Sequence, residues 1–311
     1  MTVTVREVDP ERAADTEAFA RIRHRALPCM VSTGTSIAYA VRHTHPDAHY
    51  RPLLAVADGE PIATAQVGLV HDSPEPGNAY AHVHVDPDRT GTGLGAGSLL
   101  VRTVEERLRA LGATRVYSWV LDRPACLSFA KKRGYRAGRS SHFLRLDLAN
   151  GTLPPLQEPA PGVELRTAVD FADDPRPLFA LDAEVVQDEP SDVEYQFTDY
   201  EAWLKETWHH PLLSRDLTSV AVVDGRPVAF SAARTDGAGR YGTAMTGTAR
   251  DFRGRGLAKL VKNHSLHRAR AAGLTEAFTG NDTTNGPMLA INKWFGYEIC
   301  ATEVQHVREL G

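Results

Sequence analysis

The sequence has 311 residues, of which 42% are hydrophobic and 24% charged, so we expect a folded protein of two compact units. The net charge of −4 excludes a broad basic field for nucleic acid, and no apolar run approaches the roughly 20 residues that span a membrane. The 3 cysteines fit neither a disulfide framework nor a cysteine zinc site, and the acid-bearing start lacks the features of a secretory signal, which predicts a cytoplasmic protein.

The first segments of the chain have the pattern of strands. Val3–Arg6 is short and rich in β-branched residues, and the apolar runs on either side of Asp58-Gly59 predict a tight hairpin, because Gly adopts positive φ. In the next predicted strand, Tyr80–Val85, His82 and His84 are two residues apart and therefore share a face. Because histidine titrates near neutral pH, either is a candidate general base, and a hydrogen-bonded structural histidine is the alternative.

A glycine-rich loop, Thr90–Gly95, follows that strand and precedes a helix. Leu100, Val104 and Leu108 recur at helical spacing, and Gly112 stands where a helix commonly ends in a left-handed residue. Glycines at the start of a helix let backbone N–H groups converge, which predicts a site for an anion such as pyrophosphate. A tight turn without a ligand is the alternative. No Lys-Ser/Thr pair follows the loop, which excludes a Walker-type nucleotide triphosphatase.

The same order of elements returns about 160 residues later. Asp224-Gly225 repeats the hairpin, Thr243–Thr248 repeats the following strand, and Arg253–Ala258 repeats the glycine-rich loop before a helix. Between the copies, the stretch 149–161 is rich in proline, which disfavours helix and central strand and predicts a semi-rigid linker. We therefore expect two copies of one α+β unit, at residues 1–148 and 162–311.

The loop of the second copy carries the fuller motif. Arg253-Gly254-Arg255-Gly256-Leu257-Ala258 fits the pattern Arg/Gln-x-x-Gly-x-Gly/Ala, and Met245–Thr248 and Thr279–Tyr297 flank it. In these residues the chain resembles the tandem proteins of the GNAT acetyltransferase superfamily. The first copy has Thr90 at the arginine position, which weakens both the resemblance and the expected binding there. The resemblance implies an α+β fold in which each copy has a mixed, mostly antiparallel sheet flanked by helices.

The resemblance also implies that the chain binds acetyl-CoA. In the family, pantetheine lies in a gap between the fourth and fifth strands, and the loop amides hold the pyrophosphate. In the second copy the residues so assigned are Thr248, Arg250, Arg253, Gly254, Arg255, Gly256, Leu257, Ala258, Asn281, Asn285 and Asn292. In the first copy they are Val85, Gly91, Thr92, Gly93, Leu94, Gly95 and Ala96. Helix capping is the alternative role of the asparagines, because Asn285 lies just before Pro287.

Catalytic groups are harder to assign. The family commonly uses a Glu on strand four or a water as base, and a Tyr four residues before a Gly-aromatic pair as acid. That Tyr position is Ala130 in the first copy and Asn292 in the second, and neither protonates a thiolate at neutral pH. Our candidate catalytic residues are therefore His82, His84 and Glu189.

Acids and aromatic residues occur together in the second copy, in the region where the family binds its acceptor. They are Glu184, Asp188, Glu189, Asp192, Glu194, Tyr195, Phe197, Tyr200 and Trp203. Such a set suits a cationic amine through charge pairing and cation–π contact, and a solvated surface is the alternative. His43, His45 and the pair His209-His210 lack further ligands at metal spacing, so we predict no metal site.

These observations favour an acetyl-CoA-dependent N-acetyltransferase that acts on the amine of a small molecule by direct attack on the thioester, with the second copy active. A non-catalytic acyl-CoA sensor or scaffold is one alternative. Others are transfer to a different nucleophile, transfer from a longer acyl-CoA, and acetylation of protein lysines. We expect neither nucleic acid nor membrane as a partner, and the sequence leaves the oligomeric state open.

Overall fold

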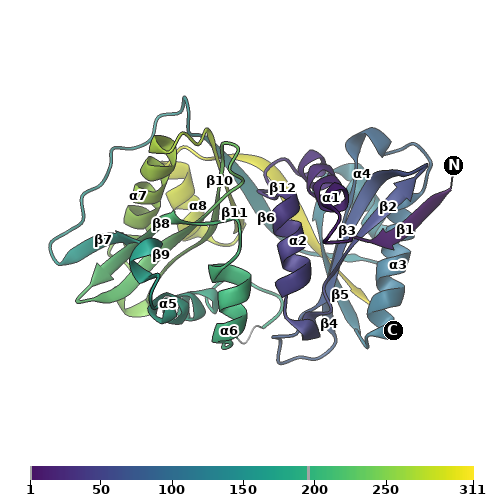
Figure 1. Cartoon of the computed structure of the whole chain (residues 1–311), viewed down its shortest axis with the longest axis horizontal. Helices are drawn as coiled ribbons and strands as arrows, with labels where there is room; N and C mark the ends of the chain where they lie inside the picture. The colour runs from purple at the N-terminus through teal and green to yellow at the C-terminus, as the bar shows by residue number, and fades with distance from the viewer. Residues whose placement is uncertain (1, 195–196) are drawn as a thin grey trace. The chain divides into compact units, whose positions relative to one another are not determined.

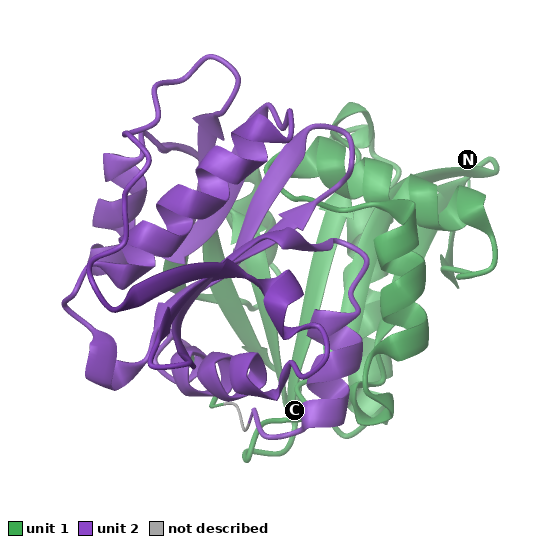
Figure 2. Ribbon diagram, turned by 60° about the vertical axis from the view of Figure 1, so that its left-hand side comes forward, with its two compact units in different colours: residues 1–141, 192–196, 301–311 green, residues 142–191, 197–300 purple. Residues whose placement is uncertain are grey.

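The computed structural model describes residues 2–194 and 197–311, and the chain forms two compact units (Figure 2). Unit 1 comprises residues 1–141, 192–196 and 301–311, and unit 2 comprises residues 142–191 and 197–300. Among the described residues, no helix combines the length and the apolar character needed to cross a membrane.

Unit 1 is built on a mixed, mostly antiparallel sheet. Its strands in chain order begin with β1 (Val3–Glu7), β2 (Arg51–Ala57), β3 (Glu60–Leu69), β4 (Asn78–Val85) and β5 (Arg115–Leu121). In space the order is β1-β2-β3-β4-β5-β12-β6, and only the β4–β5 pair is parallel among the pairings of β1 to β5. The predicted hairpin is confirmed, because Asp58 and Gly59 both have positive φ, at 49° and 85°.

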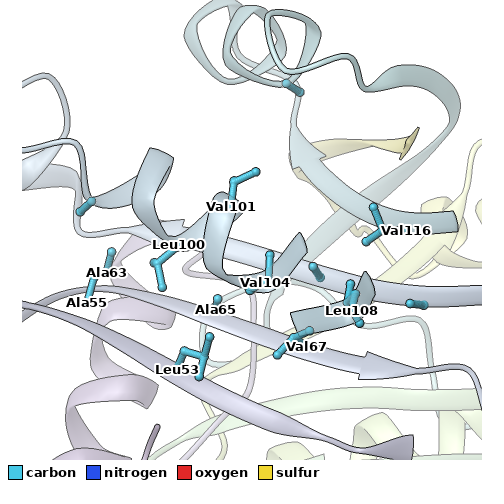
Figure 3. Close-up of a cluster of buried hydrophobic side chains, with 14 of the residues drawn as sticks. Leu53, Ala55, Ala63, Ala65, Val67, Leu100, Val101, Val104, Leu108 and Val116 are labelled. Carbon is cyan, nitrogen blue, oxygen red and sulfur yellow. The ribbon is translucent and has the colours of Figure 1, made fainter. Parts of the chain in front are cut away.

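Helices cover both faces of this sheet (Figure 1). They are α1 (Ala13–Ala26), α2 (Gly34–His43), α3 (Ala96–Ala110) and α4 (Pro124–Lys131), with short 3-10 turns η1 (Pro46–Ala48) and η2 (Pro87–Arg89). The predicted apolar face of α3 packs on one side of the sheet, where Leu100 and Val104 lie among buried residues such as Leu53 (Figure 3). On the opposite side, Phe19 of α1 packs with Leu54, the next residue of β2.

Unit 2 repeats this arrangement. Its strands are β7 (Val163–Thr167), β8 (Leu213–Val223), β9 (Arg226–Thr235), β10 (Arg240–Thr248) and β11 (Glu276–Asp282), in the spatial order β6-β11-β10-β9-β8-β7. Its helices and turns are η3 (Ala168–Phe171), α5 (Arg176–Val186), α6 (Tyr200–Trp203), the π-helical turn η4 (Leu204–Trp208), η5 (Arg250–Phe252), α7 (Leu257–Ala271) and α8 (Gly286–Trp294). Val261 of α7 packs with Ala221 on one face of the sheet, and Val185 of α5 packs with Val220 on the other.

Two strands, β6 (Arg136–Asp147) and β12 (Glu298–Glu309), pass from one unit into the other. Residues 303–309 of β12 pair with β5, so the last strand of the sequence completes the sheet of unit 1. Arg308 of β12 donates to both carboxylate oxygens of the buried Glu105, at 2.7 and 2.9 Å. The compact units therefore divide the chain differently from the sequence repeat, for which 1–148 and 162–311 remain our proposed segments.

The proline-rich stretch between the repeats contains neither helix nor strand, as predicted, in residues 149–161. It is nevertheless held against α7. Asn263 accepts a hydrogen bond from the Gln157 amide at 2.8 Å and donates to the Pro155 carbonyl at 3.2 Å, and Leu153 is buried. This segment is thus a packed part of unit 2 rather than a loose connection.

Candidate active site

In unit 2 the fourth and fifth strands of the repeat separate part-way along their length. β10 pairs with β11 in parallel only from Arg240 to Gly242, although both strands continue beyond that point. The register between β10 and β9 shifts between Thr243 and Met245, so that Ala244 is an extra, bulged residue. A bulge bends its strand. Residues 243–248 of β10 lie beyond the pairing with β11, and we call this unpaired stretch of the two strands the strand opening.

The glycine-rich loop of unit 2 leads into the uncapped start of α7. Gly254 and Gly256 both have φ of +76°, and apart from the chain neighbours no described residue has an atom within 4 Å of the place where a Cβ would stand on either glycine. Gly256 is the N-cap and offers no side-chain acceptor, so the first amides of α7 have no partner within the helix. Leu257 and Ala258 are its first residues. Converging N–H groups and the positive end of the helix dipole suit an anion here.

Two arginines beside this loop share one carboxylate. Arg250 donates to both oxygens of Asp188 at 3.0 Å, and Arg253 donates to Asp188 as well and to the Thr248 carbonyl at 3.2 Å. Hydrogen bonds from Arg250 and Arg253 lower the pKa of Asp188 to about 2. A diphosphate at the loop would compete with Asp188 for these arginines, so this acid, predicted to contact an amine, is instead a contact of the loop.

The loop of unit 1 has the same backbone but different charged side chains beside it. Gly91, Gly93 and Gly95 have φ between +73° and +78°, and Gly95 is the uncapped start of α3. The preceding turn, however, carries Asp86 and Asp88, which Arg25 of α1 binds at 3.1 and 2.5 Å. Acids close to the loop disfavour a diphosphate. Of the other residues predicted there, Val85 ends β4, Thr92 and Leu94 lie in the loop, and Ala96 begins α3, and their contact with a cofactor stays a prediction.

The strand opening of unit 1 is also different. β4 pairs with β3 without a register shift, and its parallel pairing with β5 ends at Tyr80. Beyond that point the backbone N–H of Trp119 donates to Nδ1 of His82 at 3.2 Å, so an imidazole bridges the two strands. Burial lowers the pKa of His82 to about 4 and that of His84 to about 3, which makes both weak bases at neutral pH. Their catalytic role stays a prediction.

A buried carboxylate that the sequence analysis missed lies on α5. Asp182 is 9% exposed, and Nε1 of Trp203 donates to it at 2.8 Å. Burial raises its pKa to about 6, against the lowering effects of Trp203 and Arg234. The available signal was an acid interrupting an apolar helical face, next to Leu181 and three residues before Val185.

The position of Asp182 relates it to the strand opening. Val185 packs so closely on β10 that a Cβ on Gly247 would lie 2.0 Å from its Cγ1. Glu184 of α5 accepts a hydrogen bond from the Arg250 amide at 2.7 Å, so this end of α5 lies beside the turn that follows β10. Asp182 lies earlier on α5, where the charge of Arg234 acts on it, and Arg234 stands opposite Gly242 in the β9–β10 register.

Aromatic rings of the predicted acceptor region pack around Trp203, the hydrogen-bond partner of Asp182. Ring centroids of Phe179, Tyr200 and Trp208 lie 5.6, 6.1 and 5.7 Å from that of Trp203, and Phe197 is 6.1 Å from Phe179. Of the other predicted residues, Glu189 and Glu194 are exposed, Asp192 binds Arg139 at 3.1 Å in unit 1, and Tyr195 lies outside the described residues. The catalytic role of Glu189 stays a prediction.

The three asparagines predicted near the cofactor have separate surroundings. Asn285 caps α8 by accepting from the Met288 amide at 3.3 Å, which confirms the capping alternative for this residue. Asn292 is fully buried between Lys262, whose Nζ donates to it at 2.6 Å, and Asn281, to which it donates. Burial lowers the pKa of Lys262 to about 7.

Unit 1 has apolar residues at the two positions that correspond to the buried pair Lys262 and Asn292. Val101 is the sixth residue of α3, and Lys262 is the sixth residue of α7. Ala130 precedes Gly134 by the same number of residues by which Asn292 precedes Gly296. We expect Lys262→Val alone to destabilise the protein by about 1–3 kcal/mol, because Asn292 loses its partner in the interior. The double variant Lys262→Val/Asn292→Ala should recover most of that loss. Urea unfolding of the single and double variants measures the coupling, and additive losses would contradict it.

No group of three or more histidine, cysteine, aspartate or glutamate side chains suited to a metal ion occurs within residues 2–194 and 197–311.

The acetyltransferase (GNAT) family model matches the chain twice, at residues 17–135 and 180–297. A GCN5-related N-acetyltransferase from Sphaerobacter thermophilus is similar in structure, with 23% identity, a TM-score of 0.72 and coverage of 99% of this chain and 96% of that one. A tandem GNAT protein from the clavulanic acid biosynthesis pathway is 17% identical, with a TM-score of 0.73 and 99% of each chain covered. A comparison with curated proteins found no match.

Proposed function

The chain belongs to the acetyltransferase (GNAT) family, and on that premise we propose that unit 2 transfers an acetyl group from acetyl-CoA to the amine of a small molecule. Three features that occur together in unit 2 support placing acetyl transfer there. They are the bulged strand opening, the uncapped glycine loop and the arginines beside that loop. Unit 1 has the loop geometry without the bulge, and Asp86 and Asp88, both bound by Arg25, lie beside its loop.

In this proposal the diphosphate of acetyl-CoA lies at the loop. The amides of residues 254–258 and the guanidinium of Arg253 bind it, and Arg250 is released from Asp188 toward it. The pantetheine arm lies along residues 243–248, where the strand edge is free of β11. N–H groups of that edge polarise the thioester carbonyl, which is the arrangement expected of an oxyanion site.

Asp182 supplies the acid–base chemistry of the proposal. Its carboxylate and the rings of Trp203 and Tyr200 attract a cationic amine. A carboxylate with a pKa of about 6 takes a proton from the ammonium at neutral pH better than an ordinary aspartate does. The amine nitrogen then bonds to the acetyl carbon, the carbon–sulfur bond breaks, and CoA leaves as the thiolate. Alignment of the two reactants supplies further rate enhancement, up to about 7–11 kcal/mol.

Calorimetric titration of the intact chain with acetyl-CoA, followed by thiol release with a panel of small amines, tests this function. We expect one tight site per chain and thiol release that depends on the amine. Binding without release for any amine would favour a sensor of acyl-CoA, and release without an amine requirement would favour another nucleophile.

Replacing Arg253 by threonine should weaken acetyl-CoA binding about 5- to 150-fold, which corresponds to the loss of one charge-assisted contact of about 1–3 kcal/mol. Counted back from the N-cap glycines of α3 and α7, unit 1 has Thr92 at the place of Arg253. Calorimetry measures the change. The matched control is Thr92→Arg, which should leave the affinity unchanged because Asp86 and Asp88 stay beside that loop. A strong gain from Thr92→Arg would place a cofactor site in unit 1 instead.

A further inference from the structure

The helices α1 and α5 lie at equivalent places in the two units and carry opposite charges. Their buried faces share one spacing, formed by Phe19, Ile22 and Ala26 on α1 and by Leu178, Leu181 and Val185 on α5. In this register Arg25 corresponds to Glu184, and each binds the turn before the glycine loop of its own unit. In the same register Arg23 of α1 corresponds to Asp182 of α5. At this equivalent position the side chain is therefore a cation in unit 1 and an acid in unit 2.

Arg23 lacks the partners that a guanidinium requires. Its side chain is partly exposed and makes no hydrogen bond or ion pair within the described part of the chain, and its Nε is buried without an acceptor. The group has five N–H donors and no acceptor of its own, so burial without an anion is costly. Burial lowers its pKa for the same reason, and the smaller effects of Tyr50 and Glu303 oppose this shift.

Glu303, the acid whose charge acts on Arg23, compensates that charge only in part. Glu303 of β12 is 6% exposed and forms no ion pair within 4 Å among the described residues. Burial raises its pKa to about 7, so its negative charge is reduced by protonation near neutral pH. The guanidinium thus retains a net positive charge.

Neutral polar groups line the sheet face below Arg23. In the β3–β4 register Gln66 stands opposite His82, and Thr64 stands opposite His84. Thr64 is fully buried and its Oγ1 has no partner. Burial, and then the charge of Arg23, keep both imidazoles uncharged at neutral pH. One cation with uncharged hydrogen-bonding groups around it complements a singly charged anion, whereas a phosphate of higher charge would require more cations.

We propose that unit 1 binds a small carboxylate, with Arg23 as its counter-ion and Thr64 and His84 as hydrogen-bonding partners. The two units then select molecules of opposite charge, a carboxylate in unit 1 and an amine in unit 2. Binding in unit 1 requires no acetyl transfer, so this inference stands apart from the proposed function.

Backbone amide NMR of the intact chain tests the site, because the Trp119 amide, bonded to His82, reports from the sheet face. Acetate and benzoate are the probes, titrated against chloride at constant ionic strength. We expect a saturable shift of the Trp119 signal, weakened at least 10-fold in Arg23→Gln. Arg21→Gln is the matched control, because Arg21 is exposed on the same helix. Inorganic phosphate should bind more weakly than either carboxylate.

A second variant keeps the test decisive if Arg23→Gln fails to fold. Glu303→Gln removes the competing acid and should tighten benzoate binding at pH 8 about 3- to 10-fold, a gain that misfolding cannot produce. In the wild type the affinity for benzoate should fall as pH rises through about 7, because Glu303 ionises there. Over the same range Tyr50, His82 and His84 stay uncharged and Arg23 stays charged. No saturable shift with either probe, a shift insensitive to Arg23→Gln and Glu303→Gln, or preference for phosphate would overturn the proposal.

Discussion

Replacing Gly256 by tryptophan is expected to abolish acetyl-CoA binding, with a loss of affinity of at least about 100-fold. The residue has φ of +76°, and apart from its chain neighbours no described residue lies within 4 Å of the place for a Cβ. An indole there would occupy the place that the proposal gives to the diphosphate, and an L-residue at this φ strains the backbone by about 1–2 kcal/mol. Calorimetric titration with acetyl-CoA measures the loss directly.

The matched control for this substitution is Gly95→Trp. Gly95 has the same role at the start of α3, with φ of +73° and equally open surroundings. Both variants carry similar backbone strain, so a difference between them reports on the ligand and not on folding. We expect Gly95→Trp to bind acetyl-CoA as the wild type does. Equal losses in the two variants, or an unchanged affinity in Gly256→Trp, would remove the assignment of the diphosphate to unit 2.

The second large effect is expected for Asp182→Asn, which should lower kcat by about 10²- to 10⁴-fold, the usual contribution of a general base. Asparagine still accepts the hydrogen bond from Trp203 but takes no proton. In the wild type the activity should rise with pH through about 6, where Asp182 ionises, and the variant should lose this dependence. Thiol release as a function of pH measures both. Glu189→Gln is the competing variant, and a loss there with none in Asp182→Asn would reverse the roles of the two acids.

The same substitution should stabilise the protein. The folded pKa of Asp182 lies above its unfolded value, so the folded state binds more protons between pH 4 and 6 and loses stability as pH rises through that range. At pH 7 the neutral asparagine avoids this loss, and the gain in free energy of unfolding is at most about 3 kcal/mol. Urea unfolding at pH 7 and pH 4 checks it, since the gain should disappear at the lower pH. Lost activity together with gained stability is the signature expected of a strained functional group.

Features set by local chemistry were predictable from the sequence. The Asp-Gly turns, the glycines at positive φ and the helix face of Leu100 and Val104 each depend on a few neighbouring residues. The absence of helix and strand in 149–161 follows from its prolines, and Asn285 caps α8 from the position just before Gly286-Pro287. The family motif added the fold of each unit, which local signals alone did not specify.

Features that depend on distant partners were not predictable. β6 and β12 have ordinary strand patterns, and nothing in them indicates which sheet they join. Asp188 was grouped with nearby aromatic residues, yet its partners are Arg250 and Arg253, more than sixty residues later. Asp182 lies inside a helix without a motif, so only its burial distinguishes it.

Because β12 completes the sheet of unit 1, the two sequence repeats are difficult to study as separate fragments. A fragment ending near residue 148 would lack residues 303–309, leaving β5 with a bare hydrogen-bonding edge and Glu105 without Arg308. Such a fragment is prone to aggregate, and a proteolytic nick in 149–161 should yield two pieces that co-purify. Assigning an activity to one half therefore calls for point substitutions in the uncut polypeptide.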